Sequence, residues 1–268
     1  MIRVQTHGDV AFVRMARSVL GRPLFWTGAY LVDGLLVDCG PPATARELLA
    51  ALDGHPVDQL VLTHHHEDHM GAASLLAAER RLRPQIHAQG VAILSRGFVQ
   101  EGYRRAVWGT RDRPDATALG EELRTGSMRF QVLHTPGHSA DHVCLYEPER
   151  EWLFTGDLFL GERLRFLRSD EELLPLIESL ERVGRLRVRE VFCAHRGPVP
   201  DGPAALRRKA EHLRSLRERV TDLLEQGLPE KEVARRAVGR EGPLTWFSLG
   251  RFSARNFVRS VAREGGSG

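Results

Sequence analysis

One short stretch constrains this chain more than any other feature of its sequence. Residues 63–71 read Thr-His-His-His-Glu-Asp-His-Met-Gly, and they directly follow an apolar run, residues 59–62, that predicts a buried strand. Four ligand-type side chains fall within six positions, with the spacing His-x-His-x-Asp-His: His64, His66, Asp68 and His69. Imidazole and carboxylate groups suit zinc, iron or manganese. A solvated polar loop is the plain alternative, but three further ligand-type fragments follow, so we predict a metal site.

The same order of apolar strand, small residue and ligand-type side chain recurs downstream. One apolar strand leads through His-Thr-Pro-Gly to His138, a second leads to Asp157, and a third leads to His195. Loops at the ends of strands can turn such side chains inward while the scaffold holds them in place. We therefore expect these three residues to join residues 64–69 in one site.

The remaining pattern predicts alternating strands and helices. Further strands are expected at residues 9–14, 28–32, 35–38, 85–88, 128–133, 143–146, 152–155 and 190–193. Helices are expected at residues 44–52 and 71–78, and a capping-box pattern at residues 169–172 opens another that runs to about residue 186. Residues 95–117 mix glycine and proline with aromatic side chains and predict an irregular segment. We expect residues 98–108 to cover the substrate, with help from the C-terminal helices.

The character of the chain changes after Pro203. Apolar residues at helical spacing predict a long helix with one buried face, made by Leu206, Ala210, Leu213, Leu216, Val220 and Leu223. Two more helices are expected at residues 229–238 and 253–263. We therefore divide the chain into a catalytic domain over residues 1–202, a small helical subdomain over residues 203–264, and a flexible tail over residues 265–268.

Composition narrows the functional class. The chain has 268 residues with 42% hydrophobic and 27% charged side chains, which is ordinary for a globular protein. It has neither an apolar run of transmembrane length nor a signal-peptide pattern at its start. Its three widely spaced cysteines predict reduced thiols and a cytoplasmic location. The net charge of +3 is too mild to indicate nucleic acid, so a small-molecule substrate is favoured, and a homodimer stays open.

Taken together, the fragments at residues 63–71, 134–138, 154–157 and 194–195 resemble the metallo-β-lactamase superfamily, and the likeness covers about residues 20–200. The resemblance implies an α/β fold, a four-layer αββα sandwich of two mixed sheets with helices outside. It also implies two divalent metal ions, zinc foremost, with iron and manganese open. His64, His66 and His138 would hold one metal, Asp68, His69 and His195 the second, and Asp157 would bridge both.

Other polar residues have roles that the sequence leaves open. By pattern alone Asp38 either caps a strand or anchors the metal loop from behind, and the resemblance matches it to a buried aspartate in that place. His65 alternates with the ligand positions and is expected to face away from the metals. His134 or His142 could orient a ligand by hydrogen bonding, and His142 could instead touch the substrate.

The sequence departs from the family pattern around His195. Ala194 and Arg196 flank it where the family has glycine on both sides, and the glycine is displaced to Gly197. Alanine cannot adopt every backbone conformation that glycine can, so the second metal site is expected to be altered or weaker. Arg196 is placed to meet an anionic substrate group, although a surface ion pair is the commoner fate of an arginine.

These features favour a dinuclear metal-dependent hydrolase of a small ester, thioester or lactone, acting through a metal-bridging hydroxide with Asp68 as proton carrier. Asp157 argues against the secreted β-lactamases, and residues 158–161 lack the tyrosine of the quorum-signal lactonases. The chain is most similar to the β-lactamase-like group related to glyoxalase II, whose members often carry a winged-helix-like C-terminal domain. Two alternatives remain: a phosphodiesterase or single-strand endoribonuclease with the same metals, and a mononuclear iron persulfide dioxygenase.

Overall fold

Stretches rich in β-branched and aromatic residues form two large sheets, as the sequence predicts. The computed structural model of the chain describes residues 1–97 and 99–265. The seven-stranded sheet contains, in spatial order, β1 (Ile2–His7), β2 (Val10–Met15), β5 (Thr27–Val32), β6 (Leu35–Val37), β7 (Gln59–Val61), β8 (Gln85–Ile86) and β9 (Thr117–Ala118). The six-stranded sheet contains β10 (Glu122–Arg124), β11 (Arg129–His134), β12 (Val143–Glu147), β13 (Trp152–Gly156), β15 (Glu190–Cys193) and β16 (Gly197–Pro198). Both sheets are mixed: β6 to β9 pair in parallel, and so do β13 and β15.

The two sheets face each other across an aromatic core. Tyr30 from the first sheet packs edge-on against Phe154 of the second, with ring centroids 5.4 Å apart. Phe154 in turn stacks on Phe192 at 4.7 Å. The Tyr30 hydroxyl donates a hydrogen bond to the Cys193 carbonyl at 2.6 Å, which ties the end of β15 to the opposite sheet. This packing holds β13 and β15 against the first sheet, and ligand-type residues follow the ends of both strands.

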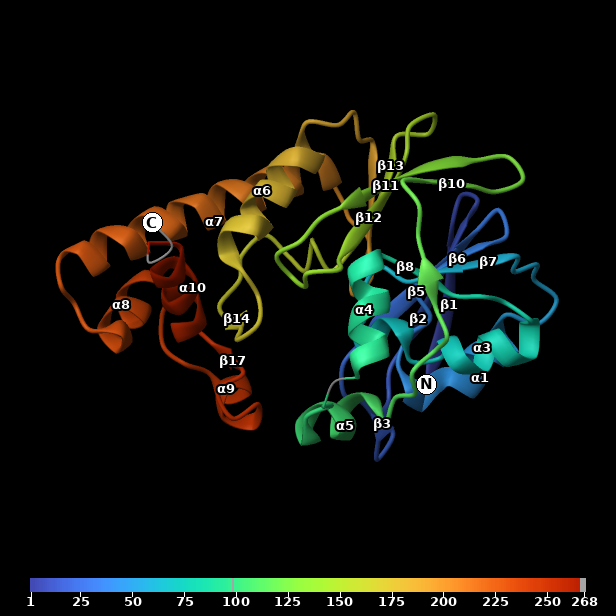
Figure 1. The fold of residues 1–268 in the computed structure, drawn as a ribbon, viewed down its shortest axis with the longest axis horizontal. Coiled ribbons are helices and arrows are strands. Elements are labelled where there is room, and N and C mark those ends of the chain that lie inside the picture. The colour runs from blue at the N-terminus through green and yellow to red at the C-terminus, as the bar shows by residue number, and fades with distance from the viewer. Residues whose placement is uncertain (98, 266–268) are drawn as a thin grey trace.

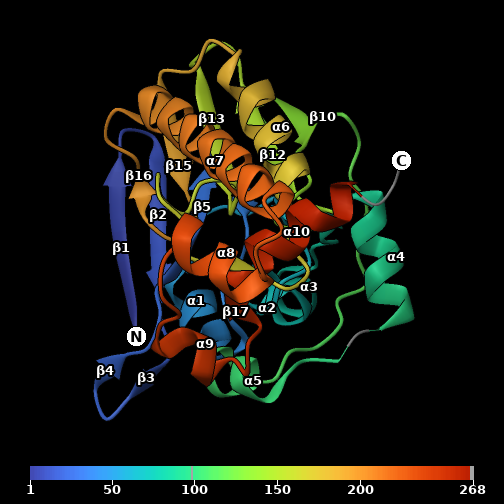
Figure 2. The same ribbon diagram turned by 90° about the vertical axis from the view of Figure 1, so that its left-hand side faces the viewer.

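Helices cover the outer faces of both sheets (Figures 1 and 2). The first sheet packs against α1 (Ala45–Ala51) and α3 (Ala73–Arg80), where Leu48 and Leu76 join the buried Leu36 and Leu60. The second sheet packs against α6 (Leu173–Gly184) and α7 (Gly202–Glu225). Shorter elements on the sandwich are η1 (Pro42–Thr44), α2 (Glu67–Met70), α4 (Ala88–Arg96) and the hairpin of β3 (Ser18–Val19) and β4 (Arg22–Pro23). The predicted four-layer αββα fold is confirmed.

The C-terminal region is helical, and it extends from α7 back toward the sandwich (Figure 1). It contains α8 (Glu230–Ala237), α9 (Pro243–Phe247) and α10 (Arg255–Gly265). A short strand, β17 (Phe252–Ser253), pairs antiparallel with β14 (Leu167–Arg168) of the preceding region. The Asn256 side chain reinforces this pairing by donating to the Leu167 carbonyl at 2.9 Å. Within the described chain, no helix combines the length and apolar character needed to cross a bilayer.

The local structure departs from expectation at three places. Residues 102–108, expected to be irregular, form helix α5 (Gly102–Trp108), because its glycines stand at the helix ends and Gly109 takes a positive φ of 95° at the C-cap. The helix expected at residues 71–78 is present as α3, but α2 precedes it, so Asp68 and His69 themselves lie on a helical turn. Glu172 is the N-cap of α6 and makes no capping hydrogen bond through its side chain, so the expected capping box is absent.

Some expectations fall outside the described residues. Phe98, at the start of the expected substrate cover, is one of them. Residues 266–268, most of the expected flexible tail, are the others. The domain boundary near residue 202 stays a prediction, and α7 begins at Gly202.

Candidate metal centre

The seven side chains expected to bind metal come together after the ends of four strands. His64, His66 and His138 form one group, and Asp68, His69, Asp157 and His195 form a second. In each group, one candidate ligand atom from every residue lies within 4.8 Å of the others. The polypeptide reaches these positions directly after β7, β11, β13 and β15. The fold thus assembles in space the fragments that the sequence placed far apart.

Asp157 lies between the two groups. Its Oδ2 is 3.2 Å from His138 Nε2, and its Oδ1 is 3.3 Å from His69 Nε2 and 3.2 Å from His195 Nε2. Each carboxylate oxygen therefore faces a different group, which is the arrangement that a bridging ligand needs. Burial opposes the charge of Asp157, but His195, His69 and His138 outweigh it and hold the pKa of the carboxyl well below its usual range.

The donor atoms themselves test whether a cation fits here. His64 Nε2, His69 Nε2 and Asp157 Oδ1 are buried, and none of them makes a hydrogen bond of good geometry in the described part of the chain. Leaving such atoms unsatisfied in a native interior is costly. Burial, followed by the neighbouring His69 and His138, lowers the pKa of His64 well below its usual value, and neutral imidazole is the form that binds a metal. Nitrogen and carboxylate donors of this kind fit a divalent cation in each group.

Asp38 anchors the metal loop from behind, one of the two roles left open by the sequence. It is buried with a left-handed φ of 62°. Its Oδ1 accepts from the backbone N–H of Thr63 at 2.8 Å, and its Oδ2 accepts from Nδ1 of His69 at 2.8 Å. The contact with His69 fixes the imidazole so that Nε2 points toward Asp157.

Two orienting contacts were missed from the sequence. Nδ1 of His138 donates to Glu171 Oε1 at 2.6 Å, and Nδ1 of His195 donates to the Trp26 carbonyl at 2.6 Å. Each leaves the Nε2 of its imidazole facing the carboxylate of Asp157. No local sequence signal marks these partners, because they come from distant segments.

The substitution of Ala194 for glycine does not displace His195. The left-handed conformation in this segment falls on Gly197, with φ 79°, and Ala194 has no positive φ. His195 still lies within the second group. The structure thus gives no geometric sign of the alteration that the sequence suggested.

Other candidate residues have contacts that keep them out of the ligand groups. His65 faces away, as expected, and its Nδ1 lies 2.8 Å from Asp141 Oδ1. His142 accepts from the backbone N–H of Asp157 at 3.0 Å, and burial lowers its pKa to about 3. His134 donates to the Ala140 carbonyl at 2.7 Å. Arg196 is exposed and donates to the Leu160 carbonyl at 2.7 Å.

A cavity of about 230 Å³ opens onto both groups. Its wall is largely aromatic and aliphatic and includes Tyr103 and Trp108 of α5 and Leu244 and Phe247 of α9. Tyr103 and Phe247 approach to 6.1 Å between ring centroids, and Trp108 lies 6.5 Å from the His195 ring. Of the expected cover, Tyr103, Arg104, Val107 and Trp108 line this cavity, as does the C-terminal helix α9; that they cover a substrate stays a prediction.

Two buried arginines line this cavity, and their partners differ. Arg104 donates to both carboxylate oxygens of Glu67, from Nε and from Nη2, the latter at 3.0 Å. Arg168 donates from Nε to Asp170, and its Nη2 lies 2.8 Å from His66 Nε2 and 3.2 Å from the His138 carbonyl. Arg104 is therefore paired with a single carboxylate, that of Glu67, whereas Arg168 also reaches the ligand groups.

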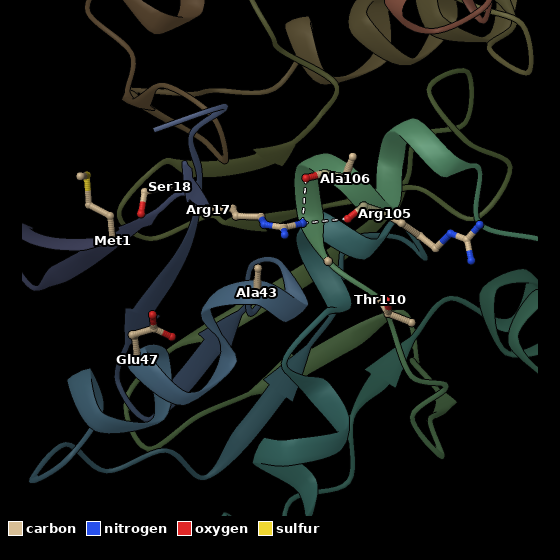
Figure 3. Close-up of a pocket in the computed structure, with 9 residues that line it drawn as sticks. Met1, Arg17, Ser18, Ala43, Glu47, Arg105, Ala106 and Thr110 are labelled. Carbon is tan, nitrogen blue, oxygen red and sulfur yellow. Dashed lines mark hydrogen bonds between the residues drawn. The ribbon is translucent and has the colours of Figure 1, made fainter. Parts of the chain in front are cut away.

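A larger cavity, of about 730 Å³, lies against the opposite side of α5 (Figure 3). Arg17 spans it and donates from Nη1 to the carbonyls of Arg105 and Ala106 at 3.0 and 2.8 Å. These are backbone carbonyls near the end of α5, so Arg17 holds in place the helix that walls the metal cavity. None of the residues that line this second cavity belongs to either ligand group.

Comparison with known proteins agrees with this geometry. Residues 29–195 match the family model "Metallo-beta-lactamase superfamily". "Lactamase-like protein aptB" of Emericella nidulans is 28% identical over 81% of this chain and 64% of its own length. "Hydroxyacylglutathione hydrolase" of Legionella pneumophila (strain Paris) is 30% identical over 63% of this chain and 61% of its own, so the chain spans less than two thirds of either relative.

A solved structure supports the fold independently. The metallo-beta-lactamase family protein from Thermus thermophilus superposes with a TM-score of 0.70 and 22% identity, over 97% of this chain and 94% of that one. The superposition covers nearly the whole chain, so the likeness includes the helical C-terminal region. With a family match that covers more than half of its residues, the chain belongs to the metallo-beta-lactamase superfamily.

Proposed function

We propose that this chain is a metal-dependent hydrolase of a small ester, thioester or lactone, and that it uses two divalent cations, zinc foremost. The observation that carries the proposal is the position of Asp157, whose two carboxylate oxygens face the two ligand groups separately. The cations would supply an activated water and polarise the scissile carbonyl. The name of the Legionella relative, a hydroxyacylglutathione hydrolase, supports acyl hydrolysis as the reaction class.

Asp68 is the residue we assign to proton transfer. It lines the cavity, and its Oδ2 lies 3.5 Å from His195 Nε2 and 3.7 Å from His69 Nε2. A carboxylate in that place takes the proton of the attacking water and returns it to the leaving group. Asp157, Asp38 and Glu171 hold the ligand groups in position and carry no proton in this scheme.

The cavity favours a small acyl compound over a polynucleotide. Its wall of Phe25, Trp108 and Phe166 is apolar, and its volume of about 230 Å³ suits a compact ligand. A strand of RNA needs a basic groove that follows its backbone. Of the two arginines in the wall, Arg104 is neutralised by Glu67.

The experiment is a substrate panel on protein whose metal content has been measured. Aryl esters, acyl thioesters and lactones form one arm, single-stranded RNA a second, and oxygen uptake with a persulfide a third. We expect turnover in the first arm, with at least a hundredfold loss in Asp68→Asn. Turnover confined to the RNA or persulfide arm would replace the proposal by one of its alternatives.

A further inference from the structure

The guanidinium group of Arg168 has more hydrogen-bond donors than its protein partners can accept. Arg168 is 5% exposed, lines the cavity and lies beside the first ligand group. Its Nε donates to Asp170, and one Nη2 proton reaches the His138 carbonyl at 3.2 Å. The remaining contacts are to the two ring nitrogens of His66, at 2.8 Å from Nη2 and 3.4 Å from Nη1.

Those contacts to His66 conflict with its proposed place among the ligands. A neutral imidazole has one acceptor nitrogen, so it cannot accept from both Nη atoms. If the lone pair of His66 is directed to a cation, Arg168 keeps Asp170 and the His138 carbonyl as its only acceptors among the described residues. Three N–H bonds of the guanidinium edge, two on Nη1 and one on Nη2, then have no acceptor among the described residues, and Arg168 lines the cavity.

The backbone holds this edge firmly in place. Arg168 lies on β14, which pairs with β17, and Phe252 is its partner in that pairing. Its backbone N–H donates at 2.8 Å to Oε2 of Glu171, whose other oxygen accepts from His138. The guanidinium and the first ligand group therefore keep a fixed relation, as substrate recognition requires.

We propose that Arg168 binds a carboxylate of the substrate, so that the enzyme selects acyl compounds that carry a second, anionic group close to the scissile carbonyl and an apolar body beyond it. This inference rests on the proposed hydrolase function and names its substrate class. A planar guanidinium edge matches a carboxylate in two parallel hydrogen bonds. A dianionic phosphate fits less well, because Asp170 and Glu171 lie beside the arginine. The apolar body would lie along Tyr103 and Phe247.

Arg168 thus takes the role that the sequence suggested for Arg196. Both residues are arginines near the ligand groups, but Arg196 is exposed and donates to a backbone carbonyl. Arg196 also lies outside the set of residues that form the cavity wall. It therefore provides a matched control, a nearby positive charge outside the substrate site.

The test compares two probes that differ in one charge. The 3-carboxybenzoyl thioester of N-acetylcysteamine and its methyl ester are assayed with wild type, Arg168→Gln, Arg168→Lys and Arg196→Gln, each with its metal content measured. We expect the ratio of kcat/KM for the acid to that for the ester to fall roughly 10- to 100-fold in Arg168→Gln, the range for a hydrogen bond to a charged group. Arg168→Lys keeps the charge without the planar edge and should give an intermediate ratio, and Arg196→Gln should match wild type. A general loss of metal lowers both rates and leaves the ratio unchanged.

Binding without turnover decides the inference separately from the hydrolase proposal. Isophthalate and its monomethyl ester are titrated calorimetrically into the same metal-loaded proteins. We expect isophthalate to bind wild type more tightly than the ester, and Arg168→Gln to remove most of that difference. The inference is overturned if wild type and Arg168→Gln prefer isophthalate over its monomethyl ester to the same degree. If none of the esters, thioesters and lactones is hydrolysed, the proposed function fails while the titration still settles the role of Arg168.

Discussion

Glu171 Oε1 accepts a hydrogen bond at 2.6 Å from Nδ1 of His138, on the side of the ring away from Asp157. The contact fixes the tautomer in which Nε2 is free to bind a cation. Removing the acceptor in Glu171→Ala should weaken metal binding roughly 10- to 100-fold, the usual cost of losing a contact that orients a ligand. Glu171→Gln retains an acceptor oxygen and should lose less. Competition titration against a chromophoric chelator measures both effects.

The neighbouring Glu172 provides the control for that experiment. It is exposed, and its side chain makes no capping hydrogen bond to α6. Glu172→Ala should therefore leave metal affinity at the wild-type value. Equal losses of metal affinity in the Glu171 and Glu172 variants would contradict this account. Metal binding would then depend on the negative charge of the segment and not on the hydrogen bond to His138.

The aromatic wall of the cavity should control substrate affinity without affecting the metals. Phe247 lines the cavity, whereas the adjacent Trp246 does not line it and is 79% exposed. Phe247→Ala should raise KM for aromatic acyl substrates about fivefold, which corresponds to about 1 kcal/mol of lost apolar contact. Trp246→Ala should leave KM unchanged. Equal KM values for wild type and Phe247→Ala would remove α9 from the substrate site.

Asp157 and His65 form a second contrast between a ligand and its neighbour. Asp157→Asn keeps one oxygen but loses the charge that faces both ligand groups, so it should lower metal occupancy and reduce turnover by several orders of magnitude. His65→Ala removes a contact to Asp141 and should be mild in both respects. Metal analysis and initial rates measure the pair. Full metal and activity in Asp157→Asn, with both lost in His65→Ala, would show that the ligand assignment is out of register.

Lys209 should make stability depend on pH. Its Nζ donates to the Leu158 carbonyl at 2.6 Å, and burial lowers its pKa from 10.5 to about 8. Between those values the unfolded chain holds more protons than the folded one, so the free energy of unfolding should increase with pH. The free energy of unfolding of wild type, relative to that of Lys209→Met, should rise with pH by at most about 1.4 kcal/mol per pH unit. This limit is the free energy that corresponds to one bound proton. Chemical denaturation between pH 8 and 10.5 measures it, and a pH-independent difference between the two proteins would contradict it.

The ligand-type residues could be predicted because each signal is local. His64 and His66 directly follow an apolar strand, and their alternation with His65 already places them on one side of the loop. Strand pattern, small residue and ligand-type residue lie within a few positions of one another. The two-sheet fold then follows from the same strands, and the comparisons confirm it.

The roles of Glu171 and Arg168 could not be predicted, because their contacts are distant in sequence. Glu171 and His138 are 33 residues apart, and Arg168 and His66 are 102 apart. The Ser-Asp-Glu-Glu run at residues 169–172 predicts a capping box, which depends on local contacts alone. In the structure Asp170 accepts from Arg168 and Glu171 accepts from His138, so tertiary contacts outweigh the local pattern.

The number of metal ions bound per chain tests the central claim most directly. Protein expressed in metal-supplemented medium and purified without chelators should be analysed by inductively coupled plasma mass spectrometry. The position of Asp157 between two ligand groups predicts close to two equivalents of divalent metal per chain. A stoichiometry that stays at one in excess zinc, iron and manganese would contradict the dinuclear site.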